Sequence, residues 1–451
     1  MASKYEMDMR FGRLAPKIIK FTIPLMLTSI LQLLYNAVDI IVVGRYVGST
    51  ALSAVGSTGS LINLIVNMFI GLSVGSSVYL AQSIGANDYD RCHKTVHTAL
   101  TSSVFIGFFL AFFGFFACRP LLHLMGSPDD VIDQATLYMK IYFLGMPGFM
   151  VYTFGSAVMR TVGDTKRPLV FLFISGLVNV ILNLITVIFF NMGVAGVAIA
   201  TITSQYISAI FVVLSLVKSD GNSRLYLKEL KVHAKTLLQM VKIGLPVAVQ
   251  SSVFSLSNVI IQSSINSFGS DVMAGNAAAS NIEGFLYVAM NAFSQAATTF
   301  VAQNYGAKLF KRVNSTLRYC LLFVFIVGSI LGPMIYLIGE PLLKIYSPDN
   351  AIAVQHGIVR LQYICCLYVV CGIMDVFSGA IRGTGTTLAP MLVSIVGVCG
   401  VRIVWIFTVF QQIHTLPSLY ISYILSWSVT AFIHFLCYLY IKKKRLSPRN
   451  I

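Results

Sequence analysis

Charged side chains are scarce in this sequence of 451 residues. Asp, Glu, Lys and Arg together make up 11% of it and only 16 residues are acidic, whereas 57% are hydrophobic. With a mean hydropathy of +0.80, the chain has too few charges to cover the surface of a water-soluble globule of this length. The composition therefore excludes a soluble protein and predicts one that crosses a membrane many times.

The usual sequence marks of an enzyme are also missing. We find no nucleophile paired with a base, no phosphate-binding loop and no metal-ligand cluster. The eight cysteines lie mostly within apolar runs and form no C-x-x-C motif, so we interpret them as small apolar residues rather than a disulfide or metal framework. We therefore expect no enzymatic activity, no cofactor and no bound metal.

Long apolar runs alternate with short polar segments along the whole chain. Each run is long enough to cross a bilayer as a helix. The twelve runs expected to span the membrane are residues 18–43, 53–83, 95–118, 134–159, 169–190, 194–217, 243–267, 274–303, 315–338, 352–381, 389–410 and 417–441. The sequence therefore predicts an all-α polytopic membrane protein with twelve transmembrane helices.

The basic residues are distributed unevenly between the two sides of the membrane. They outnumber the acidic ones by 32 to 16, which in a soluble protein would suggest a nucleic-acid partner. If the N-terminus is cytoplasmic, all but six of them fall in cytoplasmic segments or adjoining helix ends; the exceptions are Arg45, Arg119, Lys140, Lys344, Arg360 and Arg402. This asymmetry predicts that both termini are cytoplasmic and that the excess charge meets lipid headgroups rather than nucleic acid. No cleavable signal peptide is recognised, because the first apolar run is long enough to span.

The two halves of the sequence resemble each other at a nearly constant offset. The matched segments are 20–43 with 242–265, 81–86 with 302–307, and 160–168 with 382–390. Each half holds six spans, an even number, so both halves enter the membrane from the same side and are related by a pseudo-two-fold axis along the membrane normal. This arrangement is typical of transporters whose two lobes rock around a central substrate site. We predict a six-helix N-terminal lobe, a cytoplasmic linker, a six-helix C-terminal lobe and a basic cytoplasmic tail at 1–217, 218–242, 243–441 and 442–451.

Asp39 is the most unusual residue of the first predicted helix. It follows Gln32 and Asn36 at helical spacing, so the three share one face. Amides on such a face can simply form hydrogen bonds between helices, worth about 0.6 to 2 kcal/mol each. A carboxylate near the centre of a span costs at least ~2.5 to 3.5 kcal/mol and marks a function by default. Because loss of water favours its neutral form, we expect Asp39 to bind and release a proton; the alternative is that it reaches outward or pairs with Arg45.

Depth along the helices offers an independent indication of partners for Asp39. At a rise of ~1.5 Å per residue, Asp39 lies about 6 to 10 Å from the outer end of its run, and Asn183 and Thr201 lie about 10 Å from theirs. Asn179 is one turn deeper on the same face as Asn183. Four polar groups from three helices can therefore share a layer, as an ion or proton site requires.

The C-terminal half carries its own polar candidates. Asn258 and Gln262 repeat the polar stripe of the first helix without a carboxylate, and Glu283 and Tyr287 lie on a stripe of the next span. Arg402 has a similar estimated depth to Glu283, so the two could pair; a structural ion pair and a substrate or coupling role both remain open. Asp375 falls in the inner half of its span, where it would line an inward-facing cavity or meet cations at headgroup level.

Taken in order, these segments resemble the multidrug and toxic compound extrusion (MATE) family. The resemblance rests on the opening helix with LYNAVD, the helix endings AQSIGA and AQNYGA, the two Arg-to-Pro loops, and GVAGVAIATITSQ at 193–205. It implies twelve helices in two lobes and export of organic cations in exchange for H⁺ or Na⁺. In the prokaryotic branch with an acidic residue on the first helix, that residue carries the coupling ion, which Asp39 matches; the supporting groups map to Asn179, Asn183 and Thr201.

Position 183 departs from the family pattern, because many relatives have aspartate where this sequence has Asn183. One fewer negative charge weakens the case for Na⁺ and leaves Asp39 as the main proton acceptor. The working hypothesis is a monomeric antiporter of the plasma membrane that exports small organic cations in exchange for H⁺, with Na⁺ as the alternative ion. Gln32, Asn36, Asn258, Gln262, Glu283, Tyr287 and Asp375 are the candidates for the substrate cavity. A lipid or glycan flippase of a related fold is the alternative function.

Overall fold

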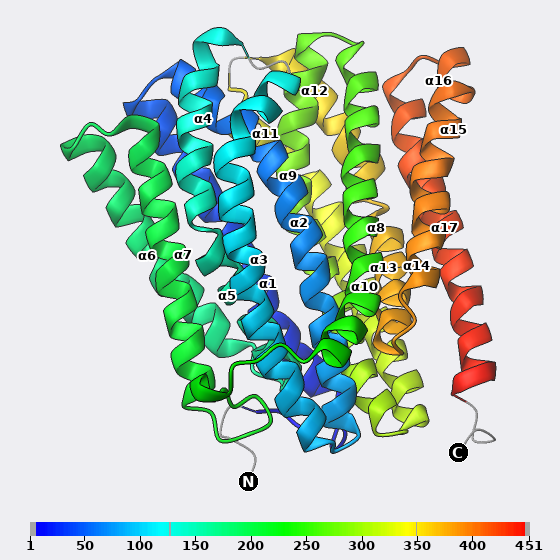
Figure 1. The fold of residues 1–451 in the computed structure, drawn as a ribbon. Helices are drawn as coiled ribbons and strands as arrows, with labels where there is room; N and C mark the ends of the chain where they lie inside the picture. The colour runs from blue at the N-terminus through cyan, green and yellow to red at the C-terminus, as the bar shows by residue number, and fades with distance from the viewer. Residues whose placement is uncertain (1–5, 126–127, 349, 447–451) are drawn as a thin grey trace. The chain divides into compact units, whose positions relative to one another are not determined.

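The computed structural model describes residues 6–125, 128–348 and 350–446, so residues 447–451 of the predicted tail lie outside it. All the regular secondary structure in these ranges is helical, and no strand occurs in them (Figure 1). The first half forms α1 (Leu14–Tyr46), α2 (Ser49–Gly85), α3 (Tyr89–Leu124), α4 (Asp129–Leu144), α5 (Met146–Thr161), α6 (Lys166–Leu184), the π-helical turn η1 (Ile185–Phe189) and α7 (Gly193–Val217).

The linker and the second half complete the series of helices. They form the 3₁₀ turn η2 (Leu227–Glu229), α8 (Ala234–Asn266), α9 (Ser270–Gly306), α10 (Phe310–Leu337), α11 (Gly339–Tyr346), α12 (Ala351–Arg360), the π-turn η3 (Leu361–Cys365), α13 (Tyr368–Gly383), α14 (Leu388–Ser394), the π-turn η4 (Ile395–Gly400), α15 (Val401–Phe407), α16 (Val409–Gln412) and α17 (Leu416–Arg445). Since α8 begins at Ala234, the last part of the predicted linker is helical.

Every predicted run coincides with a helical segment, but two of the runs are bent. The α4 and α5 segments meet at 48°, and the segments that end at Cys365 and begin at Tyr368 meet at 44°. Pro147 in the first turn of α5 accounts for the first bend, because its nitrogen cannot donate the hydrogen bond that would continue α4. Sequence periodicity did not predict either bend.

Among the described residues, nine helices are long and apolar enough to cross a membrane, and counting each bent pair as one span raises this to eleven. The 37-residue helix α9, which covers the predicted run 274–303, is not among them, and it carries the polar stripe with Glu283 and Tyr287. The all-helical membrane architecture expected from the composition is thus confirmed.

The chain separates into two compact units. The first contains Leu27–Gly244 and the segment before Met9, and the second contains Met9–Met26 and the chain from Leu245 onward. The boundaries fall inside α1 and α8, close to Pro24 and Pro246. The lobe boundaries proposed from the sequence remain a prediction.

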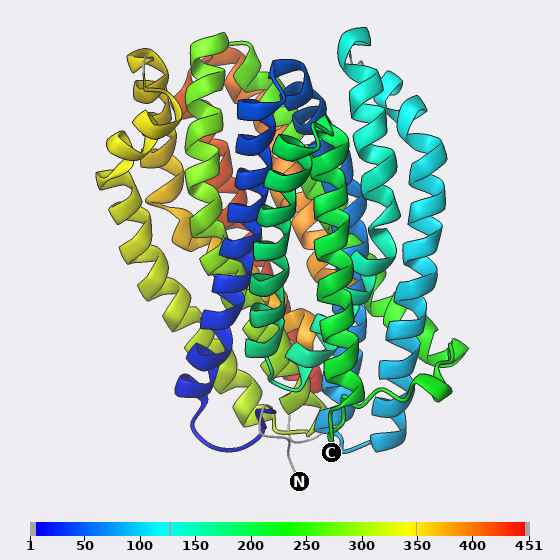
Figure 2. The ribbon, with the colours of Figure 1, turned by 90° about the vertical axis from the view of Figure 1, so that its left-hand side faces the viewer.

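The first unit holds the helices that carry Asp39 and its predicted partners. In it α5 packs along α3 and α7, and α6 packs along α7, as Figure 1 shows for the green pair α6 and α7. Figure 2 shows that the C-terminal half of α1, in dark blue, runs beside α6 and α7. Helix α1 therefore lies next to the consecutive helices α6 and α7, although α2 to α5 separate it from them in the sequence.

Candidate functional site

A buried carboxylate on α1 lies at the junction of three helices. Asp39 is only 9% exposed, and the amide nitrogen of Asn183 on α6 donates a hydrogen bond to its Oδ1. The hydroxyl of Thr201 on α7 lies 3.4 Å from its Oδ2. The carboxylate is therefore held by polar groups from α6 and α7.

Asn179 links these groups into one network. Its oxygen accepts a hydrogen bond from the Asn183 amide at 3.2 Å, and its nitrogen donates to the Thr201 hydroxyl at 3.4 Å. Asn179 and Asn183 are buried and lie one turn apart on α6. The structure therefore brings together all four residues that the depth estimate placed in one layer.

The Thr201 hydroxyl has two acceptors for its single proton. It lies 2.9 Å from the carbonyl of Val197, one turn earlier on α7, and 3.4 Å from Asp39. A hydroxyl can donate only one hydrogen bond at a time, and the shorter contact is the stronger. One oxygen of the Asp39 carboxylate therefore has only a long and contested donor.

No basic side chain neutralises Asp39 within the described part of the chain. The ion pairs found there involve other acidic residues. Arg45, the alternative partner considered from the sequence, is exposed and lies over the ring of Tyr46 at 5.9 Å. Asp39 is thus a buried acid held by hydrogen bonds alone.

One acceptor in the network is left without a partner. The side-chain oxygen of Asn183 is buried and accepts no hydrogen bond from any described residue. An unsatisfied buried polar atom costs about 1 to 3 kcal/mol. The network therefore has room for one more donor beside Asp39.

A close contact between α1 and α6 fixes the position of this network. The ring of Tyr35 lies against Gly176, where an added Cβ would come 1.7 Å from the ring carbon Cζ. The Tyr35 hydroxyl donates to the carbonyl of Phe173 at 3.3 Å. Because Tyr35 lies one turn before Asp39, the missing side chain at Gly176 allows α1 to approach α6 closely enough for the carboxylate to reach Asn183.

The other candidates on α1 are arranged differently. Gln32 and Asn36 are exposed and form no hydrogen bond with another described residue, so they are not part of the Asp39 network. Their assignment to a substrate cavity stays a prediction.

In the second unit, Glu283 pairs with Arg360 and not with Arg402, the possibility that the sequence left open. Its carboxylate binds Arg360 on α12, with 2.6 Å from Nη2 and 3.1 Å from Nε to the same oxygen Oε2. The two side chains are 13% and 5% exposed. Arg402 instead donates to Ser426 at 3.1 Å and to Asn258 at 3.4 Å. Arg402 shares the estimated depth of Glu283, but depth alone does not say toward which neighbour a helix face points.

The Glu283 pair extends into a polar cluster that also includes Gln262. Arg360 donates to Asn276 at 2.6 Å, and Asn276 donates to Gln262 at 3.3 Å. Arg360 was not recognised from the sequence as the partner of Glu283, although a signal was present. It is one of the six basic residues that do not follow the positive-inside distribution.

The hydrogen bonds of Tyr287 and Asp375 are made with residues that do not belong to this cluster. The hydroxyl of Tyr287 accepts a hydrogen bond from Asn291 at 3.4 Å. Asp375 is half-buried, and its carboxylate forms no ion pair within the described part of the chain. Its backbone carbonyl accepts from Ser294 at 2.7 Å. Their roles also stay predictions.

The family model that matches this chain is MatE, over residues 24–185 and again over residues 246–408. The two matches correspond to the two halves recognised in the sequence. The chain is 27% identical to the probable multidrug resistance protein YoeA of Bacillus subtilis, covering 96% of this chain and 95% of that protein. It is 26% identical to the probable multidrug resistance protein NorM of Thermotoga maritima, covering 86% and 84%.

Solved structures show the same fold. An outward-facing multidrug resistance MATE family transporter of the MOP superfamily superposes with a TM-score of 0.91 at 21% identity, over 99% of each chain. A MOP superfamily transporter from Pyrococcus furiosus also gives a TM-score of 0.91 at 21% identity, over 99% of each chain. The predicted fold, with twelve transmembrane helices in two lobes, is confirmed by these similarities.

Proposed function

Because this chain belongs to the multidrug and toxic compound extrusion (MATE) family of membrane transporters, we propose that it exports small organic cations in exchange for protons. The family membership agrees with the expectation that the chain is not an enzyme. We further propose that it acts as a monomer in the plasma membrane with both termini in the cytoplasm. The observation that carries the proton coupling is the buried carboxylate of Asp39, which forms no ion pair with any residue that the structure describes.

The network around Asp39 suits a group that changes its charge. When ionised, the carboxylate accepts the Asn183 amide, with Thr201 as a second and weaker donor. Protonation turns one of its oxygens into a donor. Half-turn rotations of the Asn183 and Asn179 amides then present the otherwise unpaired oxygen of Asn183 to the new O–H and let the Asn179 nitrogen donate to the same oxygen. Both charge states can therefore be satisfied by the same residues.

The composition of the site favours H⁺ over Na⁺ as the coupling ion. Hard cations are held by several oxygen ligands with carboxylates among them, and here Asp39 is the sole carboxylate of the four-residue network. Asn183 stands where the resemblance to relatives suggests a second acid. A single proton needs only one carboxylate, so the loss of the second acid is less costly for H⁺ than for Na⁺.

In the proposed cycle, a proton entering from outside neutralises Asp39 and the first unit repacks, which releases the substrate outward. Return through an inward-facing state discharges the proton to the cytoplasm. One charge moving down a membrane potential contributes ~2.3 kcal/mol per 100 mV. A pH difference of one unit contributes ~1.4 kcal/mol more. One proton can thus sustain a gradient of about tenfold or greater for an exported cation.

Purified protein in liposomes tests this proposal. Efflux of a fluorescent organic cation is measured under an imposed pH gradient, and separately under a Na⁺ gradient at constant pH. We expect the pH gradient to drive efflux and Asp39→Asn to abolish it while the variant remains inserted. Asp133→Asn, which makes the same chemical change at an exposed residue of α4, serves as the matched control.

Wild-type rates of uphill efflux by Asp39→Asn would refute the role of Asp39. Efflux driven by a Na⁺ gradient and not by a pH gradient would show that Na⁺, rather than H⁺, is the coupling ion. Translocation of labelled lipid or glycan headgroups without any cation transport would support the flippase alternative instead.

A further inference from the structure

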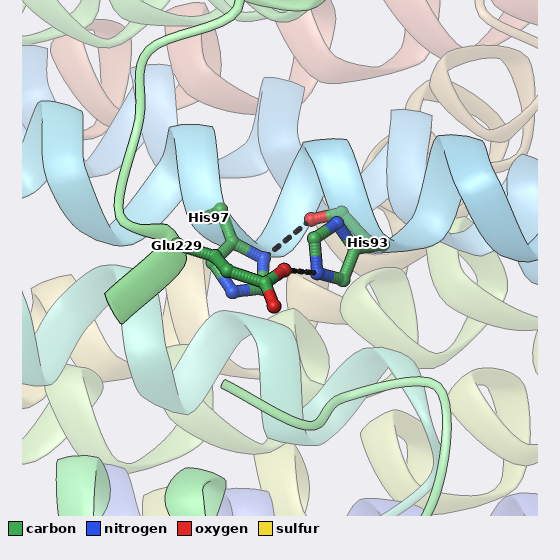
Figure 3. A group of neighbouring side chains, drawn as sticks. All are labelled: His93, His97 and Glu229. Carbon is green, nitrogen blue, oxygen red and sulfur yellow. Dashed lines mark hydrogen bonds and ion pairs between the residues drawn. The ribbon is translucent and has the colours of Figure 1, made fainter. Parts of the chain in front are cut away.

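Three side chains that could bind a metal ion meet where the linker contacts α3. His93 and His97 lie one turn apart near the start of α3, and Glu229 ends the short turn η2 (Figure 3). One ligand atom from each residue lies within 4.8 Å of those of the other two. All three residues belong to the first unit. The i, i+4 spacing of the histidines was visible in the sequence, but the approach of Glu229 from the linker was not.

The ring of His97 is fixed in the orientation that metal-binding histidines adopt. Its Nδ1 lies 2.8 Å from the backbone carbonyl of His93, to which it donates. Its Nε2 consequently carries the lone pair, which accepts the backbone N–H of Tyr226 at 3.0 Å. A backbone carbonyl that holds the opposite ring nitrogen is the usual support of a ligating imidazole.

His93 and Glu229 provide the accessible part of the cluster. Nε2 of His93 lies 2.8 Å from Oε2 of Glu229, and the two side chains are 36% and 56% exposed. The two imidazole rings stand 4.0 Å apart. The nearby cation Lys94 is paired with Asp90 at 2.6 Å, so it does not place an uncompensated positive charge beside the cluster. An ion in solution can therefore reach both His93 and Glu229.

We propose that His93, His97 and Glu229 form a binding site for a divalent transition-metal ion, with Zn²⁺ as the best match. Two imidazoles and one carboxylate, with water as the fourth ligand, are a common ligand set for Zn²⁺. Two histidines at i and i+4 on one helix present their nitrogens to the same ion. The ion would join η2 of the linker to α3.

Binding requires small movements of two side chains and the displacement of one backbone amide. Zinc bonds of ~2.0 to 2.2 Å bring tetrahedral ligand atoms to about 3.3 to 3.5 Å from one another. Rotation of the partly exposed side chains of His93 and Glu229 can lengthen their mutual contact of 2.8 Å and shorten the wider separations, which are at most 4.8 Å, to this range. At His97 the ion replaces the Tyr226 amide on Nε2, while the bond from the His233 amide to Thr98 at 3.2 Å stays in place. The linker thus exchanges one backbone contact for a carboxylate–metal contact.

The test uses the full-length protein, purified without a polyhistidine tag and treated with a chelator. Zn²⁺ binding is measured by calorimetry and by the metal retained after gel filtration. We expect one equivalent per chain for the wild type and none for His93→Ala. His123→Ala, which removes an exposed histidine from the other end of α3, serves as the control and should bind as the wild type does. Glu229→Gln should weaken binding by about tenfold or more.

Co²⁺ provides a second readout that reports the ligands directly. The wild type with Co²⁺ should show the intense visible absorption of a four-coordinate ion, and His93→Ala should lack it. His97 is buried, so the test relies on the half-buried His93 and the exposed Glu229, whose variants should keep the wild-type circular dichroism and melting temperature. Absence of metal uptake by the folded wild type, or equal uptake by His93→Ala, would overturn the proposal and leave the cluster as an ion-pair contact of the linker.

Discussion

Asn183 donates a hydrogen bond from its amide nitrogen to the carboxylate of Asp39, and this bond joins α6 to α1 at a buried point of the first unit. Family resemblance suggests a second acid at position 183, so the contact is also the place where this chain departs from many relatives. An amide can satisfy the carboxylate in either charge state because it offers both a donor and an acceptor. The first two predictions concern this pair.

Asn183→Asp should change the ion preference of the transporter. Two carboxylates within hydrogen-bonding distance repel each other when both are ionised, and a cation between them relieves the repulsion. We expect Na⁺ to stimulate transport by this variant more than transport by the wild type. We also expect Na⁺ to raise the melting temperature of the variant more than that of the wild type. The measurement is cation efflux and thermal unfolding over a range of Na⁺ concentrations at fixed pH. Asn281→Asp, at an exposed position of α9, controls for the added charge.

The pH dependence of transport should depend on Asp39. Since the proposed cycle loads a proton from outside, the initial efflux rate of the wild type should rise as the external pH falls at constant internal pH. Asp39→Asn cannot bind the proton, so any residual efflux should not vary with external pH. Stopped-flow fluorescence of the exported cation gives these rates. An unchanged pH profile in the variant would assign the proton to another residue.

Gly176→Ala should disturb the site from a distance. The new methyl group would occupy the position of the Tyr35 ring, and such overpacking costs about 1 to 3 kcal/mol. Since α1 must move away from α6, we expect slower transport together with lower stability. Tyr35→Leu should partly restore transport when combined with Gly176→Ala, because it vacates the same space. Gly56→Ala on α2 is the control, since its Cβ meets nothing within 4 Å.

Glu283→Gln should strongly destabilise the second unit. Removing the carboxylate leaves the Arg360 charge buried without its partner, which typically costs about 3 to 5 kcal/mol. The double variant Glu283→Leu with Arg360→Met removes both charges and should recover most of the lost stability. Thermal unfolding of the single and double variants in one detergent measures the coupling. If transport also fails in a stable double variant, the pair has a role beyond stability.

The sequence predicted the parts of the fold that depend on local pattern. Apolar runs predicted the helices, and the depth of Asp39, Asn183 and Thr201 predicted that they share a layer, because depth follows from the helical rise alone. The partner of Glu283 could not be settled from the sequence, because side chains at equal depth can face different neighbours. The bend before Pro147 was missed for a different reason, as an apolar run does not reveal how its axis changes direction. Glu229 reaches α3 only through the path of the linker, which no periodicity describes.

The single proton of Thr201 has a consequence for the speed of the cycle. The hydroxyl can turn from the Val197 carbonyl toward Asp39 by rotation about one bond. The Thr201 side chain can therefore respond to a change in the charge of Asp39 without any movement of the backbone. Such rotations are fast compared with collective motions of helices, which take microseconds to milliseconds. Rearrangement of polar groups around the acid should therefore never limit turnover, and the rate of transport should be set by how quickly whole helices exchange their packing.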